Sequence, residues 1–186
     1  MSKKFKAVVI DNQNEKFTRE IKELSTDDLK DGNVLVKIDY SSLNFKDALI
    51  LNNGGRIVRK YPFIPGIDFS GIVEESEDNK FKKNDNVILT GFRVGEMYFG
   101  GFSQYAKVNS DFLVKTPNDL DSLKAMKMGT AGLTALLCAF AVKAKEELLM
   151  GTKVKDVLVT GATGGVGSFA VMALSKMGYD VHAVTG

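Results

Sequence analysis

The chain has 186 residues, of which 44% are hydrophobic and 26% are charged, and its 25 Lys and Arg against 23 Asp and Glu give a formal net charge of +2. This length can bury a substantial core and, because domains usually hold about 100–200 residues, allows one large domain or one domain with part of another. Charges of both signs are interspersed, which excludes a general electrostatic argument for nucleic acid or an anionic membrane as a partner.

Cysteine and histidine occur once each, as Cys138 and His182. These counts exclude an internal disulfide and a structural zinc site with four Cys or His ligands. The apolar run from Ala7 is too short for a signal peptide, which favours a cytoplasmic protein. The longest apolar run, 131–142, has 12 residues, fewer than the ~20 of a membrane span. We therefore expect a buried helix with Cys138 in the core, and a structural His182 on a strand.

The first two thirds of the chain are typical of β-structure. Short runs rich in β-branched and aromatic residues alternate with turns of Gly, Asn and Asp. These runs are Lys6–Ile10, Val34–Tyr40, Gly71–Val73, Asn86–Leu89 and Phe102–Val108. The pattern predicts a barrel-like or sandwich domain that ends near Pro117.

After Pro117 the hydrophobic period becomes helical. We predict a short helix over 121–128, a longer one from Thr130 to about Leu149, and then a buried strand over 156–160. A glycine-rich loop follows. Next come a helix that buries one face and ends at Gly178, and a second strand over 180–184. The predicted buried face is Val166, Ala170, Ala173 and Met177.

The strand, helix and second strand form one parallel βαβ unit over 156–186. A doubly wound nucleotide-binding domain needs two βαβαβ halves. We therefore expect a β-rich domain over 1–120, followed over 121–186 by linking helices and the start of an α/β domain. The chain is expected to be the N-terminal part of a longer protein and to be inactive alone.

The loop Gly161-Ala162-Thr163-Gly164-Gly165-Val166-Gly167-Ser168 is the strongest motif. Glycines at its first, fourth and seventh positions allow a sharp turn, close approach of a pyrophosphate and tight packing of the next helix. The flanking strands and helix favour dinucleotide binding over a purely structural turn. The second strand ends at Thr185-Gly186, where NAD enzymes usually place an acidic residue, so we expect NADPH, unless that residue follows position 186.

Four segments together resemble the medium-chain dehydrogenase/reductase superfamily, in its zinc-independent quinone-oxidoreductase branch and closest to the acrylyl-CoA reductases. The segments are Asp39–Leu49, Pro65–Gly71, Gly129–Ala135 and Val159–Ser168. The resemblance implies a GroES-like β-barrel followed by the first βαβ unit of a Rossmann domain. It further implies a small-molecule substrate and a possible homodimer. Zinc-dependent relatives carry metal ligands near Asn44, Ile67 and Asp68, so no catalytic metal is expected here.

The resemblance also implies roles for individual residues. Asn44 is the candidate catalytic residue, with Phe45 beside the nicotinamide in place of the usual Tyr. Thr134 would lie nearby. The remaining cofactor residues would be Thr163, Gly164, Gly165, Val166, Gly167 and Ser168 at the pyrophosphate, and Thr185 and Gly186 near the 2′-phosphate.

Each candidate also has a structural interpretation. Asn44 could instead cap a helix over 45–51, and Asp68 could bind local backbone rather than hold a donor or position Lys46. Lys46 and Asp47 are typical of a solvated ion pair. A basic patch of Arg56, Arg59 and Lys60 could meet the phosphates of coenzyme A or remain a solvated loop.

The leading hypothesis is a metal-free, NADPH-dependent reductase of an activated C=C bond, most simply the reduction of acrylyl-CoA to propionyl-CoA. One alternative is an NADPH:quinone reductase. An alternative of another class is a protein that binds NADPH without turnover.

Overall fold

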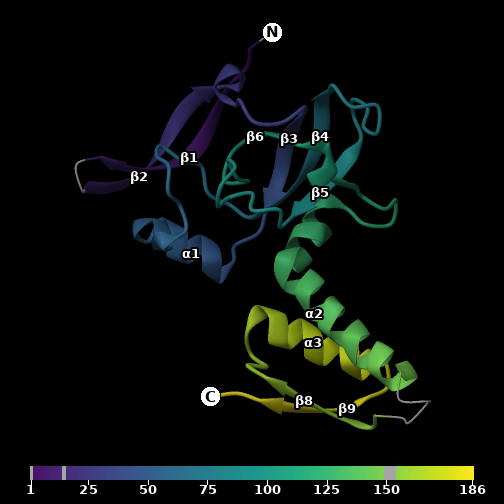
Figure 1. The fold of residues 1–186 in the computed structure, drawn as a ribbon. Coiled ribbons are helices and arrows are strands. Elements are labelled where there is room, and N and C mark those ends of the chain that lie inside the picture. The colour runs from purple at the N-terminus through teal and green to yellow at the C-terminus, as the bar shows by residue number, and fades with distance from the viewer. Residues whose placement is uncertain (1, 14–15, 149–153) are drawn as a thin grey trace. The chain divides into compact units, whose positions relative to one another are not determined.

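A computed structural model describes residues 2–13, 16–148 and 154–186. The chain divides after Gly129 into two compact units (Figure 1). The first holds the β-rich part and the second the βαβ unit. The expected order of a β-rich domain followed by α/β structure is confirmed.

The first unit begins with an antiparallel hairpin of β1 (Lys4–Gln13) and β2 (Lys16–Ser25). The sequence analysis missed β2 altogether. Its residues KFTREIKELS are mainly polar, and most of its side chains are exposed or half-buried, including Ile21 at 73% exposed. A strand that pairs on one edge and buries little has no strong hydrophobic pattern to reveal it.

A five-stranded antiparallel sheet forms the centre of the first unit, in the order β6-β3-β4-β5-β7 (Figure 1). Its strands are β3 (Val34–Ser41), β4 (Asp68–Ser76), β5 (Asn86–Thr90), β6 (Tyr105–Val108) and β7 (Val114–Lys115). Alternating residues such as Val34, Val36, Phe69 and Val73 point into one fully buried core. The predicted strand over 102–108 is shorter in the structure, beginning at Tyr105.

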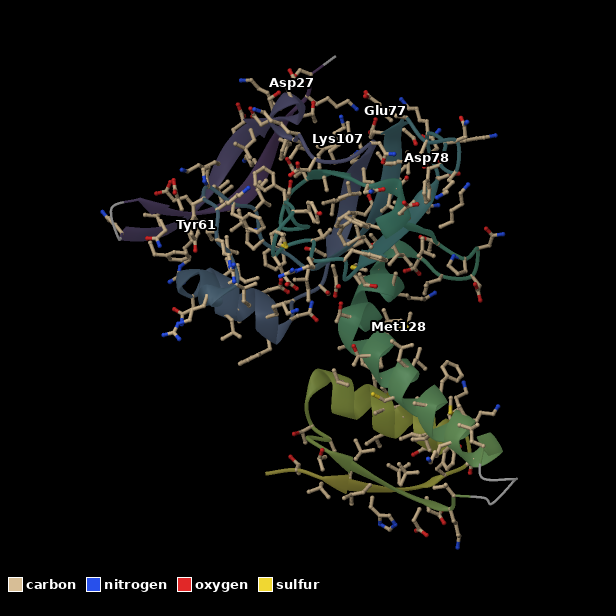
Figure 2. The ribbon with its side chains drawn as sticks, viewed as in Figure 1. Asp27, Tyr61, Glu77, Asp78, Lys107 and Met128 are labelled. Carbon is tan, nitrogen blue, oxygen red and sulfur yellow. The ribbon has the colours of Figure 1, made fainter. Side chains whose placement is uncertain are left out.

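Helix α1 (Phe45–Leu51) connects β3 towards β4 and closes a second apolar cluster. The buried residues of this cluster are Ile10 of β1, Ile50 of α1, Val58 and Phe63. Figure 2 shows Tyr61 between the hairpin and α1, where its ring lies edge-on to Phe17 with centroids 6.4 Å apart. The cluster fixes α1 and the segment that follows it against the hairpin.

Helix α2 (Ser122–Leu148) is interrupted at Gly129, whose φ of 49° and ψ of −154° are not helical. The two helices predicted on either side of this glycine are therefore present; position 149 lies outside the described residues. By length and composition, Ser122–Glu146 could cross a membrane. Gly129 breaks it, however, and Ala135 and Ala139 are fully buried. The predicted burial of the helix over 131–142 is only partly right, because four of its large apolar side chains are 39–61% exposed: Leu133, Leu136, Leu137 and Phe140.

The second unit contains β8 (Asp156–Thr160), α3 (Gly165–Lys176) and β9 (Asp180–Val184), with β8 and β9 parallel. The predicted strand over 156–160 is present, but its predicted burial is wrong, since Val159 is its one buried residue and Leu158 is 64% exposed. As predicted, Gly178 follows the end of α3 with a φ of 92°. The predicted buried face is partly wrong. Gly167, Ala170 and Leu174 are the buried residues of α3, whereas Val166 and Met177 are 40% and 37% exposed.

Cys138 is exposed, so its predicted core position is wrong. The buried stripe of α2 in this unit runs through Ala135 and Ala139, which pack with Val159 and Leu174. Cys138 precedes Ala139 by one residue and therefore lies about 100° around the helix from that stripe.

Candidate functional site

The glycine-rich loop joins β8 to α3 in a tight turn. Gly161 has a φ of 62°, and the Gly164 N–H donates to the Gly161 carbonyl over 2.9 Å. A Cβ on Gly167 would lie 2.1 Å from that same carbonyl oxygen, which no real side chain tolerates. Two of the three motif glycines are thus required by the turn itself, as their spacing predicted.

Gly164 is the N-cap of α3, and the Ser168 N–H donates to its carbonyl over 2.9 Å. The first N–H groups of a helix have no partner inside the helix, so those of the first turn face a ligand or water. Gly164 and Gly165 are exposed, and a cavity of about 490 Å³ between α2, β8 and this loop reaches them. The loop can bind a phosphate through backbone N–H groups and the positive end of the helix.

Thr163 and Thr185 lie together at the carboxyl ends of the two parallel strands. Their hydroxyl oxygens are 2.9 Å apart, and the Ala162 N–H donates to the Val184 carbonyl over 3.1 Å. Gly186 follows, exposed, with open space where a Cβ would stand. The structure thus brings the two predicted cofactor segments to one edge of the sheet, where ligands bind in such folds.

Thr134 lies on α2 in the same unit, where its hydroxyl donates to the Thr130 carbonyl over 2.7 Å. Ala131, three residues before Thr134, lies beside the glycine loop: a Cβ added to Gly165 would be 3.4 Å from the Ala131 Cβ. Residues three apart share a helix face, so Thr134 lies one turn along the side of α2 that faces the loop.

Asn44 is the N-cap of α1 and points its side chain at two buried acids. Its backbone N–H donates to Asp47 Oδ2 over 2.8 Å, which caps the helix. Its side-chain Nδ2 donates to Asp68 Oδ2, Ser42 Oγ and Asp47 Oδ2 at 3.0, 3.1 and 3.2 Å. Because the acids fix the amide nitrogen, the carbonyl oxygen of Asn44 is the atom left to meet a ligand.

Asp47 and Asp68 are both fully buried. Burial raises the pKa of the Asp47 carboxyl, while N–H donors from Asn44 and Ile67 lower it and the charge of Asp68 raises it further. Asp68 also accepts from the Ser42 hydroxyl over 2.5 Å. It therefore holds side-chain donors, the alternative to a purely local backbone role that the sequence left open.

The predicted ion pair of Lys46 with Asp47 is also wrong. Lys46 Nζ lies 2.7 Å from Glu96 Oε1, because adjacent helical residues point in different directions and Asp47 faces the interior. Phe45, the first residue of α1, is 81% exposed. Its ring is available to a ligand.

The basic patch is only partly as predicted. Arg59 and Lys60 line a cavity of about 280 Å³ together with Arg93, a residue the sequence analysis missed because it follows 33 positions later. Arg56 is exposed and does not line it. The sequence did offer one signal for Arg93: it lies between Gly91 and Gly95, and closely spaced glycines indicate a turn.

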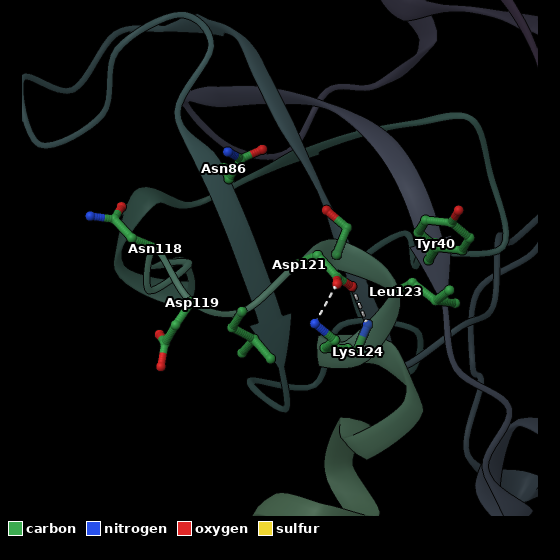
Figure 3. A pocket seen from close by; sticks show the side chains of 9 residues that line it. Tyr40, Asn86, Asn118, Asp119, Asp121, Leu123 and Lys124 are labelled. Atoms are coloured by element: carbon green, nitrogen blue, oxygen red, sulfur yellow. Dashed lines mark hydrogen bonds and ion pairs between the residues drawn. The ribbon is translucent and has the colours of Figure 1, made fainter.

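Another cavity, of about 630 Å³, lies elsewhere on the first unit and holds no predicted site residue (Figure 3). Its wall includes Tyr40, Asn86 and the polar segment around Asp121, whose carboxylate pairs with Lys124 over 3.0 Å. We assign no chemistry to this cavity. Within the described ranges, no three His, Cys, Asp or Glu side chains group as metal ligands would.

Comparison with known proteins gives the chain's relatives. The family model of the alcohol dehydrogenase GroES-like domain matches residues 30–118. Acrylyl-CoA reductase AcuI of Ruegeria pomeroyi is 50% identical over 184 residues, which cover 98% of this chain and 55% of that protein. YhfP of Bacillus subtilis, provisionally named a quinone oxidoreductase, is 45% identical over the whole chain and 56% of its own length. The chain thus spans about half the length of the curated relatives it matches.

Solved structures that share the fold include two with a bound nucleotide. The YhdH oxidoreductase from Salmonella enterica, in complex with NADP, has a TM-score of 0.90 and 45% identity over 97% of this chain and 55% of that one. YhfP with NAD bound has a TM-score of 0.88 and 42% identity over 97% of this chain and 54% of that one.

Proposed function

Since this chain belongs to the medium-chain dehydrogenase/reductase family, in its zinc-independent quinone-oxidoreductase branch, we propose that the full-length protein is an NADPH-dependent reductase of an activated C=C bond. Its substrate is acrylyl-CoA, which becomes propionyl-CoA. The observation that carries the proposal is the glycine loop, whose turn leaves the N-terminus of α3 open beside Thr163 and Thr185. The 50% identity to an acrylyl-CoA reductase supports the substrate.

The residues present fit a dinucleotide. Gly164 and Gly165 offer backbone N–H groups where a side chain would obstruct a pyrophosphate, and Thr163 and Ser168 add hydroxyl groups beside them. At the end of β9, Thr185 brings no negative charge, so a 2′-phosphate is not repelled there. One relative has NADP bound and another has NAD, so the affinities for NADPH and NADH are the direct test of this preference.

When bound, the dihydronicotinamide supplies the hydride. Reduction of the C=C bond by two electrons would place this hydride on the β-carbon and a proton, taken from water, on the α-carbon. This chain's residues contribute binding and orientation. Asn44 has its amide nitrogen held by Asp68, which leaves its carbonyl oxygen to accept a hydrogen bond from an amide or hydroxyl group of cofactor or substrate.

Phe45 contributes an exposed ring without a hydroxyl, so it offers stacking and no proton. Asn44 and Phe45 belong to a substrate domain over 1–120, and Thr134 and the glycine loop to the linking helices and nucleotide domain over 121–186. The protein acts in the cytoplasm on a small molecule. A homodimer is its expected assembly.

A quinone reductase is the second candidate, because YhfP carries that name and matches the whole chain. Steady-state assays of the full-length protein with NADPH test both. Turnover of acrylyl-CoA with a kcat/KM well above that for simple quinones supports the proposal. A kcat/KM that is higher for quinones than for acrylyl-CoA would identify a quinone reductase. Tight NADPH binding without turnover of either substrate would identify a protein that only binds NADPH. The 186-residue chain alone is expected to be inactive in the same assay.

A further inference from the structure

Two segments of the first unit enclose the basic cavity lined by Arg59, Lys60 and Arg93. One part of its lining comes from the segment 57–63 and the other from the loop 93–97. The volume, about 280 Å³, is at the lower limit of small-molecule pockets, which hold roughly 300–1,000 Å³. The cavity can therefore take one part of a ligand and not a whole cofactor.

The charge balance of this cavity favours an anion. It has three cationic side chains and one carboxylate, Glu96. That carboxylate is already neutralised from outside the cavity by Lys46 at 2.7 Å. Glu96 Oε2 also lies 3.8 Å from Arg93 Nε. The two terminal nitrogens of the Arg93 guanidinium have no ion-pair partner among the described residues. Arg59 and Lys60 have no ion-pair partner among those residues either.

The walls are apolar and rigid. Phe63 is 3% exposed, exchanges two backbone hydrogen bonds of 2.9 Å with Ile10, and lies edge-on to Phe99. Ile57 and Met97 complete the apolar lining. Charges held over an apolar surface act through a lower effective dielectric than charges in open water, so an anion here is attracted more strongly than on a solvated loop.

The loop that carries Arg93 adopts a backbone that L-residues rarely take. Phe92 and Arg93 both have positive φ, 51° and 63°. The Phe92 ring stacks on Phe112 at 4.9 Å, and the Glu96 and Met97 N–H groups donate to the Arg93 carbonyl. Such a conformation persists only where neighbours impose it, and residues held so are concentrated at ligand sites.

We propose that this cavity is a phosphate subsite, in which Arg59, Lys60 and Arg93 bind phosphoryl groups of a coenzyme A thioester. The inference rests on the proposed function and sharpens it, because a quinone has no phosphate for this subsite. Guanidinium groups bind phosphate oxygens in pairs, and charge-assisted hydrogen bonds are the stronger kind. The subsite thus explains how a substrate with a small reactive acyl group is held firmly.

The test compares two thioesters with the same reactive group in the full-length protein, at saturating NADPH. Acrylyl-CoA carries the phosphates and S-acrylyl-pantetheine lacks them. Arg59→Gln and Arg93→Gln are each expected to lower kcat/KM for acrylyl-CoA about tenfold and to leave that for the pantetheine ester unchanged. Arg56→Gln is the matched control, since Arg56 is also exposed with a φ of 59° and does not line the cavity.

The subsite would be overturned if Arg59→Gln and Arg93→Gln lowered kcat/KM equally for both thioesters, or did not lower it for acrylyl-CoA. If no variant and no wild-type protein reduces either thioester, the proposed function fails, and calorimetric titration of coenzyme A into protein saturated with NADP⁺ tests the subsite separately. Binding about tenfold weaker in Arg59→Gln and Arg93→Gln than in Arg56→Gln supports it. Binding equal in all three, or inorganic pyrophosphate binding as tightly as coenzyme A, overturns it.

Discussion

The side-chain amide of Asn44 donates to the fully buried carboxylate of Asp68 over 3.0 Å. This bond connects the N-cap of α1 to the first residue of β4, two elements separated by 24 positions in sequence. It also sets which atom of Asn44 faces outward. The capping role expected as one alternative for Asn44 is therefore present, since its backbone N–H caps the helix, while its side chain is held by the buried acid. Its contact with a ligand remains part of the proposed function.

Replacing Asn44 tests this arrangement. Asn44→Ala removes donors from two buried carboxylates and is expected to lower the free energy of unfolding by about 1–3 kcal/mol. Asn44→Asp is expected to cost more near neutral pH, because it places a third carboxylate beside Asp47 and Asp68. Urea denaturation of both variants at pH 5 and pH 8 measures the effects. The difference in free energy of unfolding between the two variants should be smaller at pH 5 than at pH 8. A larger difference at pH 5 would show that charge is not the cause.

Asp47 makes stability depend on pH in a defined direction. Burial raises its pKa in the folded state above the unfolded value, so the folded protein holds the proton more tightly. The stabilisation this provides is fully present below the unfolded pKa and is lost as pH rises through the folded pKa. Asp47→Asn removes the titration.

We expect the free energy of unfolding of the wild type, minus that of Asp47→Asn, to decrease as pH rises from about 4 towards neutrality. Denaturation of both proteins over that range measures the difference. A difference that increases with pH would mean that the donors from Asn44 and Ile67 outweigh burial.

The glycine loop was predictable because its spacing reflects local backbone needs. Gly161 must turn and Gly167 must pass close to its carbonyl, and both demands lie within seven residues of sequence. The basic cavity was not predictable in the same way. Arg93 meets Arg59 only through the packing of two distant segments, and the partner of Lys46 is Glu96, 50 residues away, and not its neighbour Asp47.

The same reasoning explains the missed strand and the misplaced cysteine. Strand β2 pairs along one edge and buries few side chains, so its sequence shows little alternation. Cys138 lies in an apolar run, and composition alone could not tell which residues of that run pack on α3. Patterns thus identified the elements with buried faces, whereas the rotation of a helix and contacts between distant loops required the structure.

Gly167→Ala tests the close approach inside the loop. A Cβ there would lie 2.1 Å from the Gly161 carbonyl oxygen, so we expect a loss of about 1–3 kcal/mol in the free energy of unfolding. Gly165→Ala is the matched control, since its Cβ would meet only the Ala131 Cβ, at an acceptable 3.4 Å. Thermal or urea unfolding of the two variants gives the comparison. Equal stability of the two would mean that the loop relaxes and that Gly167 is not required by packing.

Thr185→Asp tests the cofactor preference at the end of β9. A carboxylate at this position repels a 2′-phosphate and can bind the hydroxyl groups of a ribose, as the acidic residue of NAD enzymes does. It also replaces the hydroxyl that lies 2.9 Å from Thr163. We expect the ratio of Kd values for NADPH and NADH to shift towards NADH by about tenfold or more. Fluorescence titration of the full-length protein with each nucleotide measures that ratio, and Thr185→Val serves as the control that removes the hydroxyl without adding charge. If Thr185→Val shifts the ratio as far as Thr185→Asp, the hydroxyl and not the absence of charge sets the preference; if neither variant shifts it, the 2′-phosphate is recognised by residues other than Thr185.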